Sequence, residues 1–263
     1  MTDRRDAHTF VICAYGESPY LEECLLSLER QTVRSRICVA TSTPGETLRR
    51  LCGSRGVPLF VNPRSAGIGA DWNFALSRAD TPFVTLAHQD DVYLPLYAER
   101  MLSAMERSRR PLLFYSGYGE LRGDRVVIGG GNLTVKKILR APMALLPGSR
   151  AARRVSLAFG DPIPCPAVTF VEREIRSSPF SEDLRCDLDW DQWERLSRRE
   201  GSFVFDPGVL MLHRIHPGSE TTRVLSANGR RREDEILFRR FWPGSVARAL
   251  TGLYARSERS NER

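Results

Sequence analysis

The sequence predicts an α/β fold whose mainly parallel sheet is flanked by helices. Short apolar runs that look like buried strands alternate with segments whose apolar residues recur at helical spacing. This alternation is typical of consecutive β-α-β units. Polar residues also follow three of the expected strands directly, at 14–18, 41–43 and 88–91. Because ligands of parallel sheets bind beyond the carboxyl ends of the strands, we expect these three segments to converge on one site.

The first half of the chain defines its elements most clearly. The strands expected there, in chain order, are 9–14, 36–41, 57–61, 83–87 and 111–116. The helices expected between them are one up to about Leu28, with Ser18 as N-cap and Pro19 in its first turn, and then 46–52, 68–79 and 94–105.

The second half is less regular. Gly129-Gly130-Gly131 and a series of prolines after it predict long loops. The elements still expected are a helix over about 189–199, short strands over 203–205 and 209–212, and a final amphipathic helix around 246–253.

Composition argues against several classes of protein. Apolar residues make up 41% of the 263 residues, enough for a buried core and too many for a disordered chain. No apolar run approaches the roughly 20 residues that cross a bilayer, and Met1 to His8 is too polar for a signal peptide. We therefore expect a cytoplasmic protein. The six cysteines form no Cys-x-x-Cys pair, which favours reduced, buried thiols over a metal cluster.

Positive charge is concentrated at the end of the chain. Residues 223–263 hold ten arginines and five acidic residues, so they supply five of the seven net positive charges. No motif for binding nucleic acid accompanies them, so we expect no nucleic-acid partner. Such a tail suits peripheral contact with the anionic inner face of a membrane through its helix, and an oligomer contact would explain the same pattern.

His88-Gln89-Asp90-Asp91 carries the strongest chemical signal. Two adjacent carboxylates at the end of a buried strand repel each other and lose hydration. A hard divalent cation relieves both costs and can in turn hold a diphosphate. The alternative interpretation is that the acids favour the first turn of the helix that follows near Leu94.

Three blocks in the first third of the chain carry a family resemblance. The first runs through Val11-Ile12-Cys13-Ala14-Tyr15-Gly16-Glu17-Ser18 and, after a helix, ends at Gln31-Thr32. The second joins Asn62 and Gly67 to Asp71-Trp72-Asn73, and the third is Gln89-Asp90-Asp91. In order and spacing the blocks resemble the family 2 glycosyltransferases over about residues 9–110. The resemblance implies the GT-A fold, a Rossmann-like sheet flanked by helices.

Two later blocks continue this resemblance. The segment from Phe180 to Asp191 is similar to the block in which the family carries its catalytic carboxylate, just before an amphipathic helix. By this similarity the base is Asp189, with Asp187 and Asp191 as rivals. A late Arg-x-His of the family is matched by Arg214-Ile215-His216.

The resemblance implies an inverting transfer of a hexosyl or deoxyhexosyl group from a nucleoside-diphosphate sugar to an acceptor hydroxyl. The acceptor would be a saccharide or a lipid-linked saccharide in cell-surface polysaccharide or glycan assembly, and the cofactor Mn²⁺ or Mg²⁺. The implied site residues are the catalytic base Asp189, the metal ligands Asp90, Asp91 and His216, the nucleotide and donor contacts Ala14, Tyr15, Glu17, Thr41, Ser42, Asp71, Asn73, Gln89 and Asp90, and the acceptor-side residues Asp187, Trp190 and Arg214.

The resemblance also implies how the chain is divided. A catalytic domain is expected over residues 1–222, with a nucleotide-sugar half at about 9–115 and an acceptor half at about 116–222. A basic helical extension would then occupy 223–263.

Two positions depart from the family pattern. His88 stands where many relatives have aspartate, so it would either ligate the metal or form a hydrogen bond. No acid follows the second strand, where the sequence reads Ala40-Thr41-Ser42-Thr43 and many relatives carry an acid that contacts the nucleotide base. The base of the donor is therefore not predicted.

Four other functions remain as alternatives. A nucleotidyltransferase would share the sheet and the acidic metal ligands, but it normally has a glycine-rich basic loop after the first strand, which Ala14-Tyr15-Gly16-Glu17 is not. A glycoside hydrolase would use two facing carboxylates and no nucleotide. A basic binding module would act through residues 223–263, and a catalytically dead GT-A protein would keep the fold alone.

Overall fold

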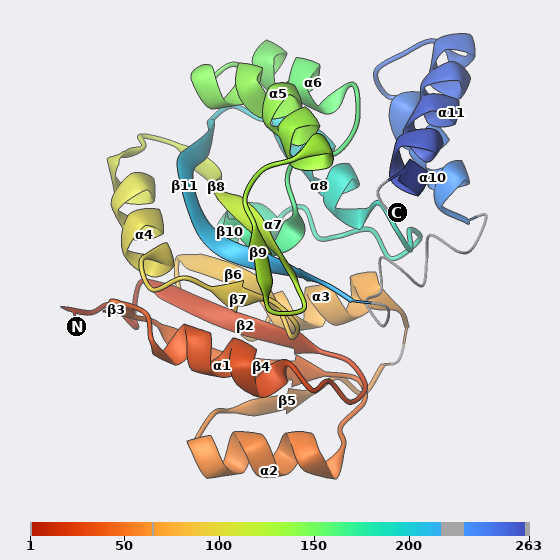
Figure 1. Ribbon diagram of the computed structural model, residues 1–263. Helices are drawn as coiled ribbons and strands as arrows, with labels where there is room; N and C mark the ends of the chain where they lie inside the picture. The colour runs from red at the N-terminus through yellow and green to blue at the C-terminus, as the bar shows by residue number, and fades with distance from the viewer. Residues whose placement is uncertain (1, 65, 217–228, 261–263) are drawn as a thin grey trace.

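The computed structural model describes residues 2–64, 66–216 and 229–260. Its centre is a nine-stranded sheet whose main path runs in the order β5-β4-β2-β6-β10-β8-β11-β7, with β9 paired to β8 (Figure 1). The strands of this sheet are β2 (His8–Ala14), β4 (Arg36–Thr41), β5 (Leu59–Val61), β6 (Phe83–His88), β7 (Val92–Tyr93), β8 (Pro111–Arg122), β9 (Arg125–Val127), β10 (Val168–Val171) and β11 (Ser202–Ile215). A separate parallel pair joins β1 (Thr2–Asp3) to β3 (Val33–Arg34).

The predicted α/β class is confirmed, and the direction of the strands divides the sheet in two. Strands β5, β4, β2 and β6 run parallel to one another. Beyond β6 the sheet is mixed, because β10 is antiparallel to both β6 and β8 while β11 runs parallel to β8. The short β7 closes the edge, antiparallel to β11.

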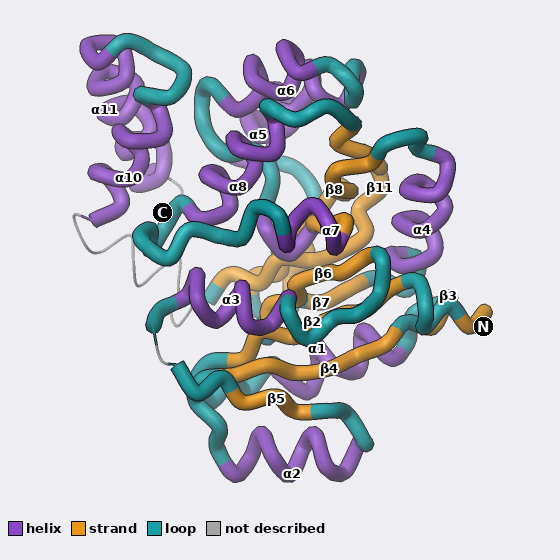
Figure 2. The backbone as a smooth tube through the Cα atoms, turned by 180° about the vertical axis from the view of Figure 1, so that it is seen from behind, coloured by secondary structure: helices purple, strands orange, loops and turns teal. Residues whose placement is uncertain are grey.

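Helices cover both faces of the sheet (Figure 2). They are α1 (Leu21–Glu29), α2 (Glu46–Arg55), α3 (Ile68–Leu76), α4 (Tyr97–Arg107), α5 (Gly131–Leu145), α6 (Arg150–Leu157), a 3₁₀ turn η1 (Cys165–Ala167), α7 (Glu172–Arg176), α8 (Leu188–Ser197), α10 (Gly229–Phe238) and α11 (Gly244–Ser260). None of these helices, in the described part of the chain, combines the length and apolar character needed to span a membrane.

The apolar run of β2 builds the core on both sides of the sheet. Val11 packs into the cluster that holds Trp72 of α3, while Phe10 and Ile12 face the cluster formed with α1 and α4. The side chains of Phe10, Val11 and Ile12 are fully buried. This alternation is the period of two that a strand imposes on its side chains. A strand that is buried on both faces consists of a continuous run of apolar residues, and this run made β2 recognisable from the sequence.

Several element boundaries differ from expectation. Helix α1 begins at Leu21 rather than at Pro19, and Ser18 Oγ instead accepts a hydrogen bond from the backbone N–H of Tyr20 (3.3 Å). The two strands expected after residue 202 form the single strand β11, whose register with β8 shifts between Asp206 and Val209. Opposite this irregularity stands Gly117, where an added Cβ would lie 2.7 Å from a backbone oxygen of the bulged segment.

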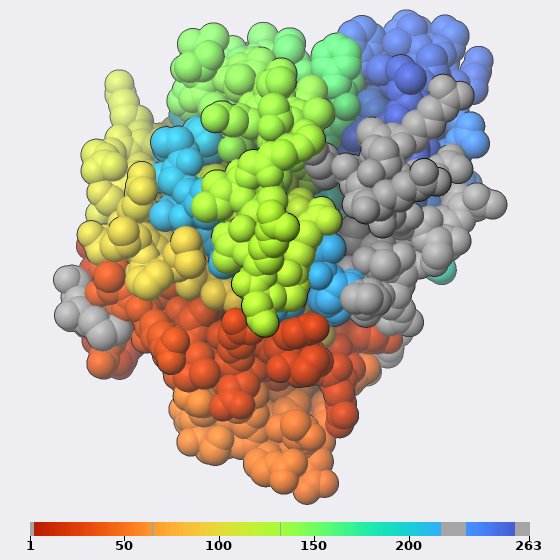
Figure 3. Space-filling model, viewed as in Figure 1, coloured from red at the N-terminus to blue at the C-terminus, as the bar shows by residue number. Residues whose placement is uncertain are grey.

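Helices α5 and α6 replace the long loops expected after the glycine run. Gly130 has a positive φ of 123° and precedes α5, so the glycines mark the helix start rather than an extended loop. Pro142 lies inside α5. Together with β9, α5 covers the middle of one face of the molecule, coloured light green in Figure 3.

Helices α10 and α11 pack beside α8. Leu237 and Phe238 of α10 are buried in the main core, and the Phe238 ring lies 4.9 Å from that of Trp190 in α8. In α11, Ala247 and Thr251 are also buried. The expected boundary at residues 222 and 223 lies outside the described residues.

Candidate functional site

Three parallel strands bring the expected site segments to one edge of the sheet. The pairing register places Ala14 of β2 beside Thr41 of β4, and Cys13 beside His88 of β6. Ala14, Thr41 and His88 are the last residues of their strands, so the polar segments that follow leave the sheet side by side. The arrangement is the one expected for ligand binding at the carboxyl ends of parallel strands.

Gln89 ties the loop after β2 to the loop after β6. Its Oε1 accepts the backbone N–H of Tyr15 at 3.2 Å, and its Nε2 donates to the Tyr15 carbonyl at 2.9 Å. The next residue, Gly16, has φ of 63° and donates its N–H to Thr43 Oγ1 at 2.7 Å. The backbone of this loop is thus fixed at both ends, while the Tyr15 ring is 56% exposed and can stack on a planar ligand. Glu17 is exposed beside it.

A hydrogen-bonded carboxylate joins β4, β5 and α3. Ser42 Oγ donates to Asp71 Oδ2 at 2.7 Å, and Asn62 Nδ2 donates to Asp71 Oδ1 at 2.8 Å. Asn62 belongs to the block that carried the resemblance, but it was not expected to be a site residue. Asn73, by contrast, turns to the backbone of Phe180, which it holds by two hydrogen bonds of 2.8 and 3.0 Å. This contact fixes the segment that leads to α8.

The end of β11 reaches the acidic segment after β6. Asp91 is fully buried, and its Oδ1 accepts the backbone N–H of Arg214 at 2.8 Å and lies 3.0 Å from His213 Nδ1. His216 Nε2 lies 3.0 Å from Asp90 Oδ2. Burial lowers the pKa of His213, but the charge and hydrogen bond of Asp91 outweigh burial and raise the pKa above its usual value. The expected metal residues Asp90, Asp91 and His216 therefore lie together.

The residues of this cluster fit a divalent cation. One side-chain ligand atom from each of His88, Asp90 and Asp91 lies within 4.8 Å of the other two. His88 Nε2 and Asp91 Oδ2 are buried, and neither has a hydrogen-bond partner among the described residues. A buried lone pair and a buried carboxylate oxygen left unpaired are costly, and a cation bound between them would remove that cost. Carboxylate and imidazole are both suitable ligands for such an ion.

Arg214 contacts the backbone of this cluster. Its Nε donates to the Asp90 carbonyl at 2.8 Å, and its guanidinium also pairs with Glu23 of α1. With its side chain only 8% exposed, it holds the backbone of the acidic segment in place. The structure therefore places Arg214 against the backbone of the candidate metal residues rather than at an open acceptor surface.

Asp189 lies in the first turn of α8 beside a second carboxyl group. Asp161, which precedes η1, has its carboxyl group beside that of Asp189, and its Oδ1 accepts the backbone N–H of Ile163 at 2.9 Å. Burial, and then the neighbouring charge of Asp189, raise the pKa of Asp161 well above its usual value. Two carboxyl groups this close together disfavour a second negative charge, which is why Asp161 holds its proton more tightly.

Lys136 of α5 brings positive charge to this pair. Burial lowers the pKa of Lys136, but Tyr118 and Asp161 outweigh burial and raise it. The ammonium also lies 5.9 Å from the centre of the Tyr118 ring. Asp161 and Lys136 were missed at the sequence level. Their relevance comes from packing against Asp189, and the only local signal was an aspartate set among prolines.

The rivals of Asp189 are both engaged elsewhere. Asp187 is 3% exposed, and burial and the nearby charge of Asp234 raise its pKa well above the usual value. Asp191 is 2% exposed and pairs with Arg195 at 2.8 Å and Arg240 at 2.6 Å. Of the three expected carboxylates, only Asp189 retains partial exposure.

Two expected acceptor-side positions need correction. Trp190 is fully buried, and its Nε1 donates to the Leu157 carbonyl at 3.0 Å, so no face of the ring is open to a ligand. Asp187 faces α10, where Arg230 Nε lies 3.8 Å from its Oδ1. Both side chains pack against other parts of the chain and do not face solvent.

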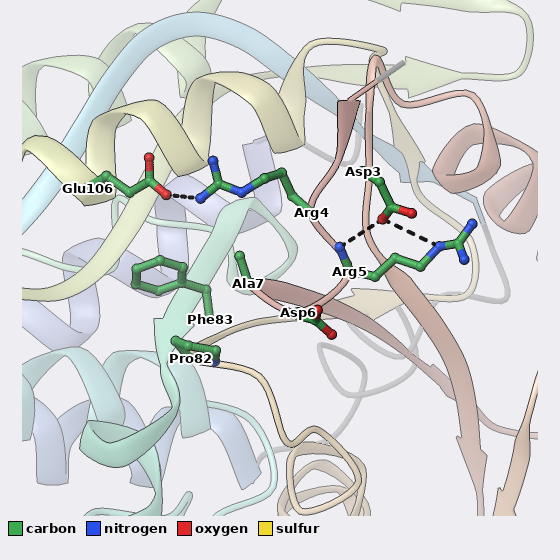
Figure 4. A pocket seen from close by; sticks show the side chains of 8 residues that line it. All are labelled: Asp3, Arg4, Arg5, Asp6, Ala7, Pro82, Phe83 and Glu106. Carbon is green, nitrogen blue, oxygen red and sulfur yellow. Dashed lines mark hydrogen bonds and ion pairs between the residues drawn. The ribbon is translucent and has the colours of Figure 1, made fainter.

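A separate hollow of about 700 Å³ lies at the opposite edge of the sheet (Figure 4). It is lined by residues 3–7, Pro82, Phe83 and Glu106, and Figure 4 shows Arg4 paired with Glu106 across it. Phe83 and Ala7 mark the amino ends of β6 and β2, so this hollow is remote from the strand ends that carry the acidic cluster. Arg4 and Arg5 pair with Glu106 and Asp3, and Asp6 pairs with Arg36 outside the hollow. We assign the hollow no function.

The sequence matches one family model. Residues 9–168, which is more than half of the chain, match the model described as Glycosyl transferase family 2. A search of the curated proteins finds no match.

Solved structures share the fold across most of the chain. A mannosyltransferase of Pyrobaculum calidifontis, in complex with GDP-Man and Mn²⁺, superposes with a TM-score of 0.67 at 14% identity, covering 96% of this chain and 70% of that one. S. aureus TarS 1-349, in complex with UDP-GlcNAc, gives 0.64 at 14% identity, with 93% and 70% covered. Glucosyl-3-phosphoglycerate synthase of Mycobacterium tuberculosis, in complex with Mn²⁺ and UDP-Glc, gives 0.58 at 17% identity, with 90% and 80% covered. At these identities the likeness concerns the fold alone.

Proposed function

The chain belongs to glycosyltransferase family 2 and has the GT-A fold, and from this premise we propose that it transfers a sugar from a nucleoside-diphosphate sugar to an acceptor hydroxyl with inversion. One observation carries the proposal. The carboxyl edge of the sheet holds a buried His88 nitrogen and a buried Asp91 oxygen that lack partners among the described residues, beside the carboxylate of Asp90. Such a set suits a cation that holds a diphosphate.

The donor would lie across the ends of β2, β4 and β6. In this proposal Tyr15 stacks on the nucleotide base, and the backbone at Ala14 and Thr41 lines the nucleotide together with Glu17 and Ser42. The carboxylate of Asp71, held by Ser42, faces the ribose or the sugar. Gln89 keeps the loop of Tyr15 in position, and Asn73 acts through the Phe180 segment rather than on the donor itself.

Asp90, Asp91 and His216, together with His88, would hold Mn²⁺ or Mg²⁺. When bound, the ion supplies positive charge that stabilises the departing diphosphate. The protein's own contribution is to orient the ligands. Arg214 fixes the backbone of Asp90, and His213 fixes the carboxylate of Asp91. The Mn²⁺ in two of the solved complexes described above supports this part of the proposal.

Asp189 would act as the general base. In a direct displacement the acceptor oxygen forms a bond to the anomeric carbon, and the bond from that carbon to the diphosphate oxygen breaks. The hydroxyl proton passes to the carboxylate of Asp189. Lys136 stabilises the negative charge of the pair.

The cellular setting of the reaction is inferred from residues outside the candidate site. We infer a cytoplasmic enzyme of cell-surface polysaccharide or glycan assembly, with a catalytic domain over 1–222 and an extension over 223–263. Val246 and Leu253 of α11 are 40% and 59% exposed, and Arg248 is exposed beside them. An apolar row with a basic neighbour supports peripheral contact with an anionic membrane that carries a lipid-linked acceptor.

Calorimetric titration tests the donor site directly. UDP, GDP and TDP are titrated with and without Mn²⁺ into the wild-type protein and into Asp90→Ala. We expect one nucleotide to bind in a Mn²⁺-dependent manner, and the substitution to remove that dependence. An Asp183→Ala control, which removes an exposed carboxylate before α8, keeps binding. No binding of any nucleotide to the wild type under either condition would overturn the proposal.

A further inference from the structure

Four arginines from three parts of the chain surround a hollow of about 440 Å³ on the surface. Arg150 and Arg154 belong to α6, Arg198 follows α8, and Arg240 lies between α10 and α11. Arginines usually spread over a surface because like charges repel each other. Their convergence here brings four guanidinium groups to one place.

A buried carboxylate holds three of these arginines in position. Glu194 of α8 is 1% exposed, and it accepts hydrogen bonds from Arg154 and Arg198 at 2.7 Å and from Arg240 at 3.3 Å. Burial raises the pKa of Glu194, but the hydrogen bonds from Arg198 and Arg154 outweigh burial and bring it below the usual value. Glu194 is therefore ionised and fixes the guanidinium groups around it.

The acids beneath the hollow do not balance its positive charge. Besides Glu194, Asp191 pairs with Arg240 at 2.6 Å and with Arg195 at 2.8 Å. The four lining arginines and Arg195 thus face two carboxylates, which leaves three positive charges. Arg150 is exposed and forms no ion pair with the described acidic residues.

Preorganised guanidinium groups with surplus charge are suited to a phosphate group. Each guanidinium presents parallel N–H donors whose spacing matches two phosphate oxygens. Because Glu194 already orders three of the arginines, a ligand would lose little of its binding energy to ordering them. Exposed apolar side chains also occur at the end of α5 and in α6, among them Leu145, Leu146 and Val155 at 79%, 60% and 53%.

We propose that this four-arginine pocket is a second ligand site, which binds the phosphate group of an anionic ligand. The phosphate comes either from the headgroup of an anionic lipid or from a soluble phosphate ester, and the exposed apolar side chains at the end of α5 and in α6 suit the lipid source. The site is built from α6, α8 and the α10–α11 turn, and it uses none of the candidate donor residues. The proposal does not depend on the proposed sugar transfer.

Binding to two probes tests this site in the full chain. The first probe is inorganic pyrophosphate, titrated in the presence of EDTA so that the candidate cation site does not contribute. The second is co-sedimentation with vesicles of phosphatidylcholine alone or mixed with phosphatidylglycerol. Arg150→Gln is the main variant, because Arg150 forms no described ion pair and its loss leaves Glu194 and its partners in place. The charge-matched control is Arg49→Gln, an exposed position on α2.

We expect the wild type to bind at least one probe, and Arg150→Gln to weaken that binding by about three- to tenfold, in line with the loss of one charge-assisted contact. Arg49→Gln binds like the wild type. Binding that Arg150→Gln weakens assigns the site to a lipid headgroup if it is seen only with the mixed vesicles, and to a soluble ester if it is seen with pyrophosphate and not with the vesicles. Binding to neither probe, or equal weakening by the two substitutions, overturns the proposal.

Discussion

The carboxylate of Glu233 in α10 lies 2.8 Å from the backbone nitrogen of Cys186 and accepts its N–H. The same carboxylate also accepts the N–H groups of Arg185 at 2.9 Å and Asp187 at 3.2 Å. These three backbone donors lie directly before α8, two to four residues before Asp189. An acid from the basic C-terminal extension thus caps the segment that positions the candidate base.

Replacing Glu233 by alanine is expected to lower both stability and turnover. Three backbone N–H groups lose an ionised acceptor, and a hydrogen bond to a charged group contributes about 1.5–3 kcal/mol. We expect the free energy of unfolding to fall by about 2–3 kcal/mol in urea titrations. We expect the loss of activity to come from a lower kcat more than from a higher KM for the donor. The candidate donor residues lie in other parts of the chain than the segment before α8.

Glu235→Ala is the matched control for Glu233. Among the described residues its carboxylate pairs with Arg239 one turn away, and the Arg239 side chain is 50% exposed. An exposed pair of this kind contributes roughly 0.3–0.5 kcal/mol. If Glu235→Ala destabilised the protein as much as Glu233→Ala, the capping role would be wrong and any loss of charge in α10 would explain both results.

Asp189→Asn is expected to abolish most of the transfer while leaving the donor bound. The amide keeps the size of the side chain but cannot accept the acceptor proton, and loss of a general base costs roughly 10²- to 10⁴-fold in rate. Steady-state transfer and nucleotide titration on the same preparation separate the two effects. Asp183→Asn, exposed in the same segment, serves as the control. Near-normal turnover in Asp189→Asn would remove Asp189 from the mechanism.

Asp161 makes stability depend on pH in a defined direction. Burial and Asp189 raise its pKa in the folded chain, so between its usual value of 3.8 and the raised pKa the unfolded chain holds fewer protons than the folded one. Stability therefore falls as the pH rises through this window, by up to about 1.4 kcal/mol per pH unit. In Asp161→Asn the slope should become shallower but persist, because the pKa of Asp187 is raised in the same way.

Urea unfolding of the wild type and of Asp161→Asn, measured at several pH values from 4 upward, gives both slopes. Asp124→Asn, which changes an exposed turn residue, provides the comparison. Identical slopes for the wild type and Asp161→Asn would mean that Asp161 titrates normally in the folded chain.

The sequence predicted the parallel half of the sheet well. The strand expected over 36–41 is β4 with the same bounds, because an apolar run buried on both faces differs clearly from the turns around it. The convergence of residues 14–18, 41–43 and 88–91 followed from topology alone, since parallel strands end at one edge. Local pattern was sufficient wherever the relevant contacts lie between neighbouring β-α-β units.

What the sequence did not predict depends on contacts between distant segments. Asp161 matters because it packs against Asp189, and no periodicity encodes that meeting. The tail was expected to be a basic extension suited to a membrane or oligomer contact, yet Phe238 is in the core and Arg240 pairs with Asp191. Trp190 was expected near an acceptor because of its place beside Asp189, but adjacent residues on a helix face different directions.

The role of His88 can be separated from its packing. Its ring lies 5.3 Å from that of Trp72, so its contribution could be stacking alone, yet its buried Nε2 has no partner among the described residues. His88→Phe keeps a ring against Trp72 and removes the nitrogen. We expect this substitution to weaken Mn²⁺ binding by about 10- to 100-fold, as loss of a ligand or of its close support does.

Electron paramagnetic resonance of free Mn²⁺ measures the affinity without any substrate, and Trp72→Phe, which alters the stack and keeps the imidazole, is the control. Unchanged Mn²⁺ affinity in His88→Phe, together with its loss in Asp90→Ala, would assign His88 to packing, because only the carboxylate would then be holding the ion.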